Sequence, residues 1–321
     1  MDLFFNRPKD ILRYIDKPTR LDAILDACLH ENVKVGFLKA DVVTTKGALV
    51  SLLHRTGTFN VSFLDGKLYI DKHLVYDPSP TEIKRSWIIN KNGYVGKYGF
   101  ELACTTPRDP VIDASSRHQA PHGLNDWRAI ICTYLGGFNL LLAGDIPCVK
   151  APYTAAPANY MELKCRKLGS DLRKDLKDWY FRAHIMGASG VFVGYRDDEH
   201  VLRAKEFIPT TDILARLGTS WDPTDNINRL FQVLYTLREH CQQAVDQLEL
   251  RNDHRRKDIT WNMGFRGGGL YIHELTHDEA EMNIKSARSL PQPLQKRAGI
   301  LPRSVIKEIQ KSVMTRALEM N

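Results

Sequence analysis

The chain has 321 residues, of which 43% are hydrophobic and 26% are charged. This length suits one large domain or two modest ones, and the composition excludes a disordered, collagen-like or coiled-coil protein. Lys and Arg number 45 against 38 Asp and Glu, which gives a net charge of +7. A basic balance favours a polyanionic partner such as nucleic acid, although many basic proteins bind none.

The six cysteines form no C-x-x-C pair and no zinc-finger spacing. They are expected to be reduced thiols of a nuclear or cytosolic protein. No window approaches about 18 uninterrupted apolar residues, and the first residues are too polar for a signal peptide. The sequence therefore predicts no membrane partner.

The first half of the chain predicts a helical segment followed by short strands. Residues 8–35 carry apolar residues at helical spacing. The stretch FNVSFLDGKLYIDKHLVY alternates apolar and polar residues around Asp65-Gly66, which predicts a β-hairpin. Two apolar strands separated by Gly136-Gly137 are expected within 127–149, and YMELKC is a further strand.

The second half predicts a helix over 171–188, a strand-turn-strand unit over 190–207 and a long amphipathic helix over 226–250. Beyond residue 250 the chain is rich in Lys, Arg, Gly and Pro, with a last helix from about Val305. This texture predicts a domain over 1–250 and a loosely packed basic C-terminal extension over 251–321.

Acidic residues end several of the predicted strands. In Glu162-x-Lys164 both side chains project from one face of a strand, because side-chain directions alternate with period two. Asp145 ends the preceding apolar strand, and Glu101 closes the segment GKYGFE. Three acids and a lysine are the groups that Mg²⁺-dependent phosphodiester hydrolysis needs, but E-x-K is also a common surface ion pair on exposed strands.

Several segments in succession resemble the DXO family of RNA decapping nucleases and 5′-end exoribonucleases. ADVVTTKGALVSLL resembles the family's F-V-T-x-R-G-x-L-x-x-L-L segment, YGFE its G-h-x-F-E box, AGDIPC its G-E-h-D-C box and YMELK its Y-h-E-h-K box, where h is apolar. LKDWYFRAHIMGASGVFVGYRD and WDPTDNINRLFQVLYTL are similar to later family segments. The resemblance covers residues 37–240.

The resemblance implies an α+β fold of two mixed, mostly antiparallel β-sheets flanked by helices, with a central pocket that takes an RNA 5′ end, as in relatives of the D-(D/E)-x-K nucleases. It implies Mg²⁺ or Mn²⁺ as the cofactor of active members. Carried over position by position, the catalytic residues are Glu101, Asp145, Glu162 and Lys164. The metal would face Glu101, Asp145, Glu162 and the Leu163 carbonyl, and RNA would face Lys46, Lys164 and Arg182.

The chain departs from the family pattern within the site. Lys46 stands for an arginine, Asp145 for a glutamate, Pro147 for the central aspartate ligand and Arg182 for a glutamine. Proline offers no side-chain oxygen, and a guanidinium can hold phosphate without activating water. The pattern resembles degenerate insect members that are thought to shield nascent RNA 5′ ends in germline chromatin, and it predicts RNA binding without cleavage and without a required metal.

Three alternatives stay open at this point. The chain could be an active decapping enzyme, 5′-pyrophosphohydrolase or 5′–3′ exoribonuclease. It could also be a scaffold that binds a nuclear partner, such as a 5′–3′ exonuclease or a chromatin-bound complex, with no role in RNA. Finally, His273-Glu-Leu-Thr-His277 matches the H-E-x-x-H zinc pattern, but no histidine follows it to serve as a third ligand.

Overall fold

Seven strands drawn from three parts of the sequence form the larger sheet of the protein. The computed structural model describes residues 21–73, 95, 100, 104, 128–150, 156–251, 259–285 and 297–319. The chain forms two compact units. The first consists of Met1–Lys17, Pro78–Ala129 and Asp145–Asp222, and the second of Pro18–Asp77, Ile130–Gly144 and Pro223–Asn321.

The seven-stranded sheet belongs mainly to the second unit and has the order β11-β10-β2-β3-β1-β5-β4. The interior strand β1 runs parallel to β3 and β5, whereas β2 pairs antiparallel with both β3 and β10. Its strands are β1 (Val42–Thr45), β2 (Thr58–Leu64), β3 (Lys67–His73), β4 (Arg128–Leu135), β5 (Phe138–Asp145), β10 (Thr260–Arg266) and β11 (Gly269–Glu274).

Turn chemistry sets two hairpins of this sheet. Asp65 and Gly66 both have positive φ, at 52° and 71°, which is the backbone that a two-residue turn with this twist requires. Gly136 and Gly137 provide the same freedom between β4 and β5, with φ of 54° and 104°. The predicted hairpin at Asp65-Gly66 and the two strands predicted on either side of Gly136-Gly137 are confirmed.

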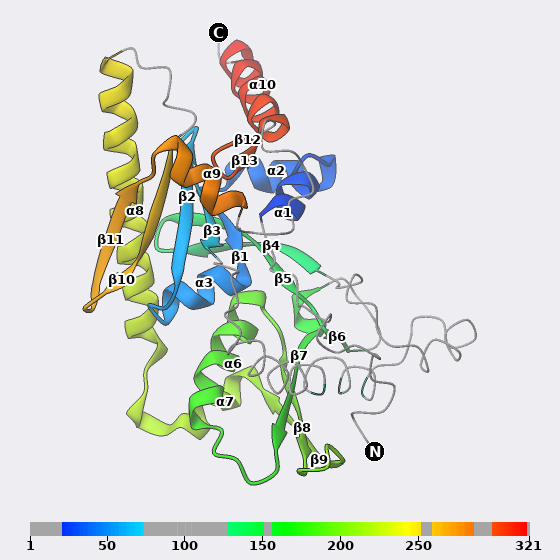
Figure 1. Cartoon of the computed structure of the whole chain (residues 1–321). Coiled ribbons are helices and arrows are strands. Elements are labelled where there is room, and N and C mark those ends of the chain that lie inside the picture. Colours follow the sequence, from blue (N-terminus) through cyan, green and yellow to red (C-terminus); the bar gives the residue numbers. More distant parts are fainter. Residues whose placement is uncertain are drawn as a thin grey trace. The chain divides into compact units, whose positions relative to one another are not determined.

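Helices surround the second unit's sheet. Its helices are α1 (Asp22–Cys28), α2 (Glu31–Lys39), α3 (Lys46–Leu53), α8 (Pro223–Leu250), α9 (His277–Lys285) and α10 (Arg303–Glu319). One core cluster packs residues of α1, α2 and α10 against Val43, Tyr69 and Leu141 of the sheet. Figure 1 shows α8, in yellow, alongside the sheet, and α8 contacts both α3 and β2.

The segment after residue 250 differs from the expected loose extension. β10 lies between β11 and β2 in the sheet, and Trp261 and Met263 are fully buried. Arg297 of the short hairpin β12–β13 (Arg297–Ala298, Leu301–Pro302) forms a buried ion pair with Asp22, 2.6 Å long. The alternation of apolar and polar residues in TWNMGFR indicates a strand. The charged residues and glycines around this segment obscured that pattern.

The single helical segment expected over 8–35 is also different. Residues 8–20 lie outside the described residues, and the remainder forms α1 and α2 with a break between them. His30 is extended, with ψ of 139°, and precedes the first residue of α2. The break allows the two helices to bury apolar side chains in the same cluster, including Cys28 and Phe37.

The first unit contains a four-stranded mixed sheet of order β6-β7-β8-β9. β7 and β8 are parallel, and β8 and β9 are antiparallel. Its elements are β6 (Cys148–Val149), β7 (Tyr160–Lys167), α6 (Arg173–Met186), β8 (Gly190–Arg196), β9 (Leu202–Pro209) and α7 (Thr210–Leu217). None of the helices in the described part of the chain is long and apolar enough to cross a membrane.

Candidate functional site

The carboxylate of Glu162 lies in the centre of the first unit's sheet and is almost fully buried, at 3% exposure. Lys164, two residues along β7, places its Nζ 2.9 Å from Glu162 Oε2. The pair forms because residues i and i+2 of a strand share a face. A buried carboxylate needs a compensating cation, and Lys164 supplies one from the same strand.

Asp145 at the end of β5 accepts a hydrogen bond from Arg128 Nε over 3.0 Å. Both side chains are partly exposed, at 29% for Arg128 and 39% for Asp145, so the pair contributes little to stability. Sequence reasoning missed Arg128. A two-residue turn at Gly136-Gly137 aligns Arg128 with Asp145 across the hairpin, and this register was the signal that could have found it.

Pro147 lies between β5 and β6, at the position that the resemblance assigns to the central metal ligand. Its side chain is a hydrocarbon ring, and its nitrogen carries no hydrogen. The neighbouring Ile146 is 9% exposed and belongs to the apolar core. The side chain of residue 147 therefore offers no oxygen to a metal ion.

Arg182 projects from α6 and pairs with Asp178 one turn earlier on the same helix. Its Nε lies 2.6 Å from Asp178 Oδ2, and the two side chains are about one third exposed. A phosphate that binds Arg182 would therefore compete with a resident carboxylate. Such an i,i+4 pair is weak at a solvated helix surface, which permits this exchange.

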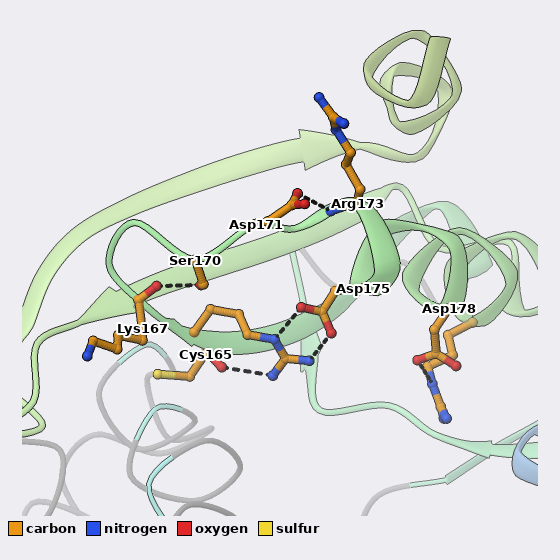
Figure 2. A network of polar contacts seen from close by, with 9 residues as sticks. Cys165, Lys167, Ser170, Asp171, Arg173, Asp175 and Asp178 are labelled. Atoms are coloured by element: carbon orange, nitrogen blue, oxygen red, sulfur yellow. Dashed lines mark hydrogen bonds and ion pairs between the residues drawn. The ribbon is translucent and has the colours of Figure 1, made fainter. Parts of the chain in front are cut away.

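An ion pair between Arg166 of β7 and Asp175 of α6 holds this helix against the strand. Arg166 donates Nε to Asp175 Oδ2 and Nη2 to Asp175 Oδ1, over 2.8 and 2.6 Å. Its guanidinium also lies 5.4 Å from the ring centre of the buried Trp179. Figure 2 shows Asp175 on α6 directed at this guanidinium, with Asp178 farther along the helix. The pair positions the helix that carries Arg182.

The remaining predicted residues are placed differently. Lys46 belongs to the second unit, where it begins α3 and is buried at 6% exposure. Thr45 caps this helix, with its Oγ1 accepting from the Ala48 backbone N–H. Glu101 lies outside the described residues. The structure thus brings together Glu162 and Lys164, with Leu163 between them, and places Asp145 and Arg182 in the same unit.

The described donors fit a divalent ion poorly. Lys164 binds the buried Glu162, Arg128 binds Asp145, and Pro147 offers no side-chain oxygen. Among the residues that the structure describes, no three His, Cys, Asp or Glu side chains are arranged to hold a metal ion. His273 lies on β11 and His277 is the first residue of α9, so the two histidines do not lie one turn apart on a helix as the zinc pattern requires.

Comparison with known proteins identifies the class to which this fold belongs. The family model described as RAI1 like PD-(D/E)XK nuclease matches residues 6–303. The chain therefore belongs to the RAI1-like PD-(D/E)XK nuclease family, which confirms the resemblance to decapping nucleases.

Two relatives show the level of similarity. The decapping nuclease RAI1 of Cryptococcus neoformans is 26% identical over 252 residues, which are 69% of this chain and 62% of that protein. The decapping nuclease RAI1 of Yarrowia lipolytica is 24% identical over 243 residues, covering 69% of this chain and 68% of that protein. The chain thus spans about two thirds or less of the length of these relatives.

Solved structures confirm the fold. Rai1 of Scheffersomyces stipitis matches 97% of this chain and 84% of its own, with a TM-score of 0.66 and 18% identity. Rai1 of Candida albicans, solved in complex with pU5-Mn²⁺, matches 97% of this chain and 85% of its own, with a TM-score of 0.67 and 15% identity. The predicted mixed α+β fold with two sheets flanked by helices is confirmed.

Proposed function

We propose that this chain binds RNA 5′ ends and has lost, or largely lost, the metal-dependent hydrolysis of its family. One observation carries the proposal: Arg128 holds Asp145, and Pro147, which stands at the position of the family's central aspartate ligand, has no side-chain oxygen. Lysine and arginine keep positive charge available for phosphate, but they do not lower the pKa of a bound water as a divalent ion does.

The relatives support RNA as the ligand. The Candida albicans Rai1 structure holds pU5, a 5′-phosphorylated oligonucleotide, together with Mn²⁺. In this chain Lys164 and Arg182 are the candidate phosphate contacts of the first unit, and Lys46 is a further candidate in the second. Glu162 orients Lys164, and Asp178 holds Arg182 until phosphate replaces it.

The test compares binding with turnover. RNAs with 5′-triphosphate, 5′-monophosphate or a cap analogue should bind the wild-type chain in EDTA, with unchanged lengths and 5′ groups after incubation in Mg²⁺ or Mn²⁺. The double variant R128Q/P147D restores an acid at 147 and removes the cation from Asp145. It should bind Mn²⁺ measurably more tightly by electron paramagnetic resonance than wild type.

The matched control is R203Q, which removes a similar pair with Asp197, 2.5 Å long, at another place in the first unit. It should leave Mn²⁺ binding and RNA binding unchanged. Release of nucleotides or cap by the wild-type chain, abolished in Glu162→Ala, would contradict the proposal.

A second candidate function is an active decapping or exonucleolytic enzyme. The intact Glu162-x-Lys164 pair on a buried strand favours it. This candidate requires turnover by the unmodified chain, whereas the binding function predicts activity only after residue 147 is changed to aspartate.

The resemblance also supports a nuclear location and a protein partner, such as a 5′–3′ exonuclease or a chromatin-bound complex. A scaffold without an RNA role would keep its partner when Lys46, Lys164 and Arg182 are all changed to glutamate. Affinity purification of this triple variant beside wild type separates the two functions. If the triple variant no longer binds RNA but keeps its protein partner, the chain's own surface binds the RNA. If the biological function of the triple variant is also unchanged, the scaffold function is favoured.

A further inference from the structure

One face of the second unit's sheet carries polar side chains where β3, β2, β10 and β11 lie side by side. On β2 and β10 the apolar residues Val61, Trp261 and Met263 are fully buried, and their neighbours alternate to the opposite face. On that opposite face Asn262 pairs across the strands with Asn60, and Gly264 with Tyr271. We call the group formed by Asn60, His73, Asn262, Arg266 and Tyr271 the polar strip.

The members of the polar strip contact one another in sequence across four strands. The Arg266 guanidinium lies 4.7 Å from the centre of the Tyr271 ring. Tyr271 donates its hydroxyl to Asn262 Oδ1 over 3.5 Å, and Asn262 Nδ2 donates to Asn60 Oδ1 over 3.2 Å. Asn60 Nδ2 lies 3.2 Å from His73 Nδ1. A cation, an aromatic ring, two amides and an imidazole therefore form one continuous series of contacts.

Accessibility rises along the polar strip toward the β10–β11 turn. Asn60 is buried, Asn262, His73 and Tyr271 are half-buried, and Arg266 is exposed. Gly264 allows the Tyr271 ring to lie across β10, because a Cβ there would be 2.7 Å from the tyrosine oxygen. The turn itself contains Gly267 and Gly268, both with positive φ. Figure 1 shows this hairpin, in orange, at the edge of the sheet.

The same face is closed at its other end. A Cβ on Gly299 would meet Thr260 Oγ1 and Ser62 Oγ, so the β12–β13 turn lies directly on the sheet there. Asn283 of α9 donates to Asn60 over 3.4 Å and borders the strip. A hydrogen-bond network that only fixed the strand register or held α9 in place would explain the contacts of Asn60 and Asn283. It does not explain a half-buried tyrosine ring with an exposed guanidinium over it at the other end of the strip.

From this arrangement we propose that the polar strip is a binding surface for single-stranded RNA, in which Tyr271 stacks on a base, Arg266 contacts a phosphate and Asn262 contacts a base edge. Amide side chains pair with base edges, aromatic rings stack on bases of any sequence, and arginine attracts phosphate. This inference rests on the proposed function for its ligand class, RNA. It adds an RNA contact in the second unit, made by residues that were not among the predicted site residues.

Charge at the strip suits a polyanion. Residues 261–272 contain no Asp or Glu. Asp71, the cross-strand partner of Asn60, is 3% exposed and so presents almost no carboxylate to solvent. An acidic peptide would match the charge but would gain nothing from a stacking ring, and it serves as the competing ligand in the test.

The test measures RNA affinity as a function of RNA length and salt. Two 5′-monophosphorylated oligouridines of about 4 and about 16 nucleotides bracket the range of site sizes for single strands. For the longer RNA, Tyr271→Leu should weaken binding about tenfold, the loss expected for one stacked base. Arg266→Gln should reduce the slope of log affinity against log salt by about 0.7, as for one lost phosphate contact. Tyr271→Phe should bind as wild type, because it keeps the ring.

The matched controls lie on α8 of the same unit. Tyr235→Leu removes a ring that is 50% exposed, and Arg229→Gln removes an exposed arginine. Neither should change RNA affinity. A 4-thiouridine in the longer RNA should cross-link to Tyr271 or its neighbours in wild type, as located by mass spectrometry, and this readout does not depend on any variant folding.

The two proposals fail in different ways. If a 5′-hydroxyl RNA binds as well as a 5′-phosphorylated one while Tyr271→Leu still weakens binding, the 5′-end function fails and the strip holds. If wild type, Tyr271→Leu and Arg266→Gln bind the longer RNA alike and no cross-link reaches β10 or β11, the strip proposal is wrong. Displacement by poly-glutamate but not by oligouridine would assign the strip to an acidic protein instead and would equally overturn it.

Discussion

At the scale of single residues, the ion pairs of the first unit have different consequences because their burial differs. Lys164 neutralises a carboxylate that is almost completely enclosed, so Glu162 depends on it. Glu206 on β9 is about one third exposed and accepts from both Arg216 Nη2 and the Tyr195 hydroxyl, over 2.6 and 2.8 Å. The hydrogen bond from Arg216 is the main cause that lowers the pKa of Glu206 below its ordinary value.

A carboxylate with a lowered pKa stabilises the fold at pH values above its unfolded pKa, and that contribution is lost as pH falls through the folded pKa. Arg216→Gln should therefore reduce the free energy of unfolding at pH 7 by about 0.5 kcal/mol, after allowance for solvent screening. The difference from wild type should be smaller at about pH 3, below the ordinary pKa of glutamate, because the carboxylate takes up its proton as pH falls through the lowered pKa of the folded state. Urea unfolding followed by circular dichroism at the two pH values measures this.

Arg229→Gln is the control for this measurement, since its pair with Asp225 is 3.8 Å long and well exposed. It should leave unfolding unchanged at both pH values. An Arg216→Gln effect that stayed constant down to about pH 3 would mean that arginine packing, and not its charge, stabilises this region.

At the scale of elements, glycine determines how closely strands and helices approach. The β4–β5 turn uses Gly136 and Gly137, both with positive φ, but only Gly136 lies against a helix. A Cβ on Gly136 would come within 2.5 Å of the Phe231 ring on α8, whereas a Cβ on Gly137 would meet nothing within 4 Å. Phe231 in turn packs against Phe138 at 5.9 Å between ring centres.

Gly137→Ala should cost about 1 to 2 kcal/mol, the backbone penalty of a left-handed residue. Gly136→Ala should cost about 1 to 3 kcal/mol more, because it also forces Phe231 from its position. Thermal unfolding of the two variants beside wild type gives the difference directly. Equal destabilisation would show that the α8 ring moves aside without cost.

At the scale of the whole molecule, the second unit is assembled from both halves of the sequence. Trp261 and Met263 of β10 are fully buried against β2, and the buried Arg297–Asp22 pair joins residues 275 positions apart. The Arg297 guanidinium also donates to the Ile300 carbonyl. The segment after residue 250 therefore completes the sheet and the core of this unit.

A chain that ends at residue 250 should lose cooperative unfolding of the second unit, because the truncation exposes the β2 edge and the core residues that faced β10. A chain that ends at Lys311 retains the buried Val305, Ile306 and Ile309 and should unfold near the wild-type midpoint. Calorimetry and limited proteolysis of the two truncations test this. A sharp, native-like transition in the shorter chain would contradict the structural role given to β10 and β11.

The sequence by itself determined the features that depend on local geometry. Asp65-Gly66 and Gly136-Gly137 set their turns, the period of two put Glu162 and Lys164 on one face, and successive motifs identified the nuclease family. Each of these follows from backbone dihedral preferences or from spacing within a few residues.

Only the tertiary structure decided which distant residues meet. It placed the parallel β1 between β3 and β5, set Lys46 in a different unit from Lys164, and aligned the amides of Asn60 and Asn262. These pairings depend on strand order and on which surfaces each helix covers. Local sequence does not encode strand order, because any strand with a suitable apolar face can pair with several others until the whole core is packed.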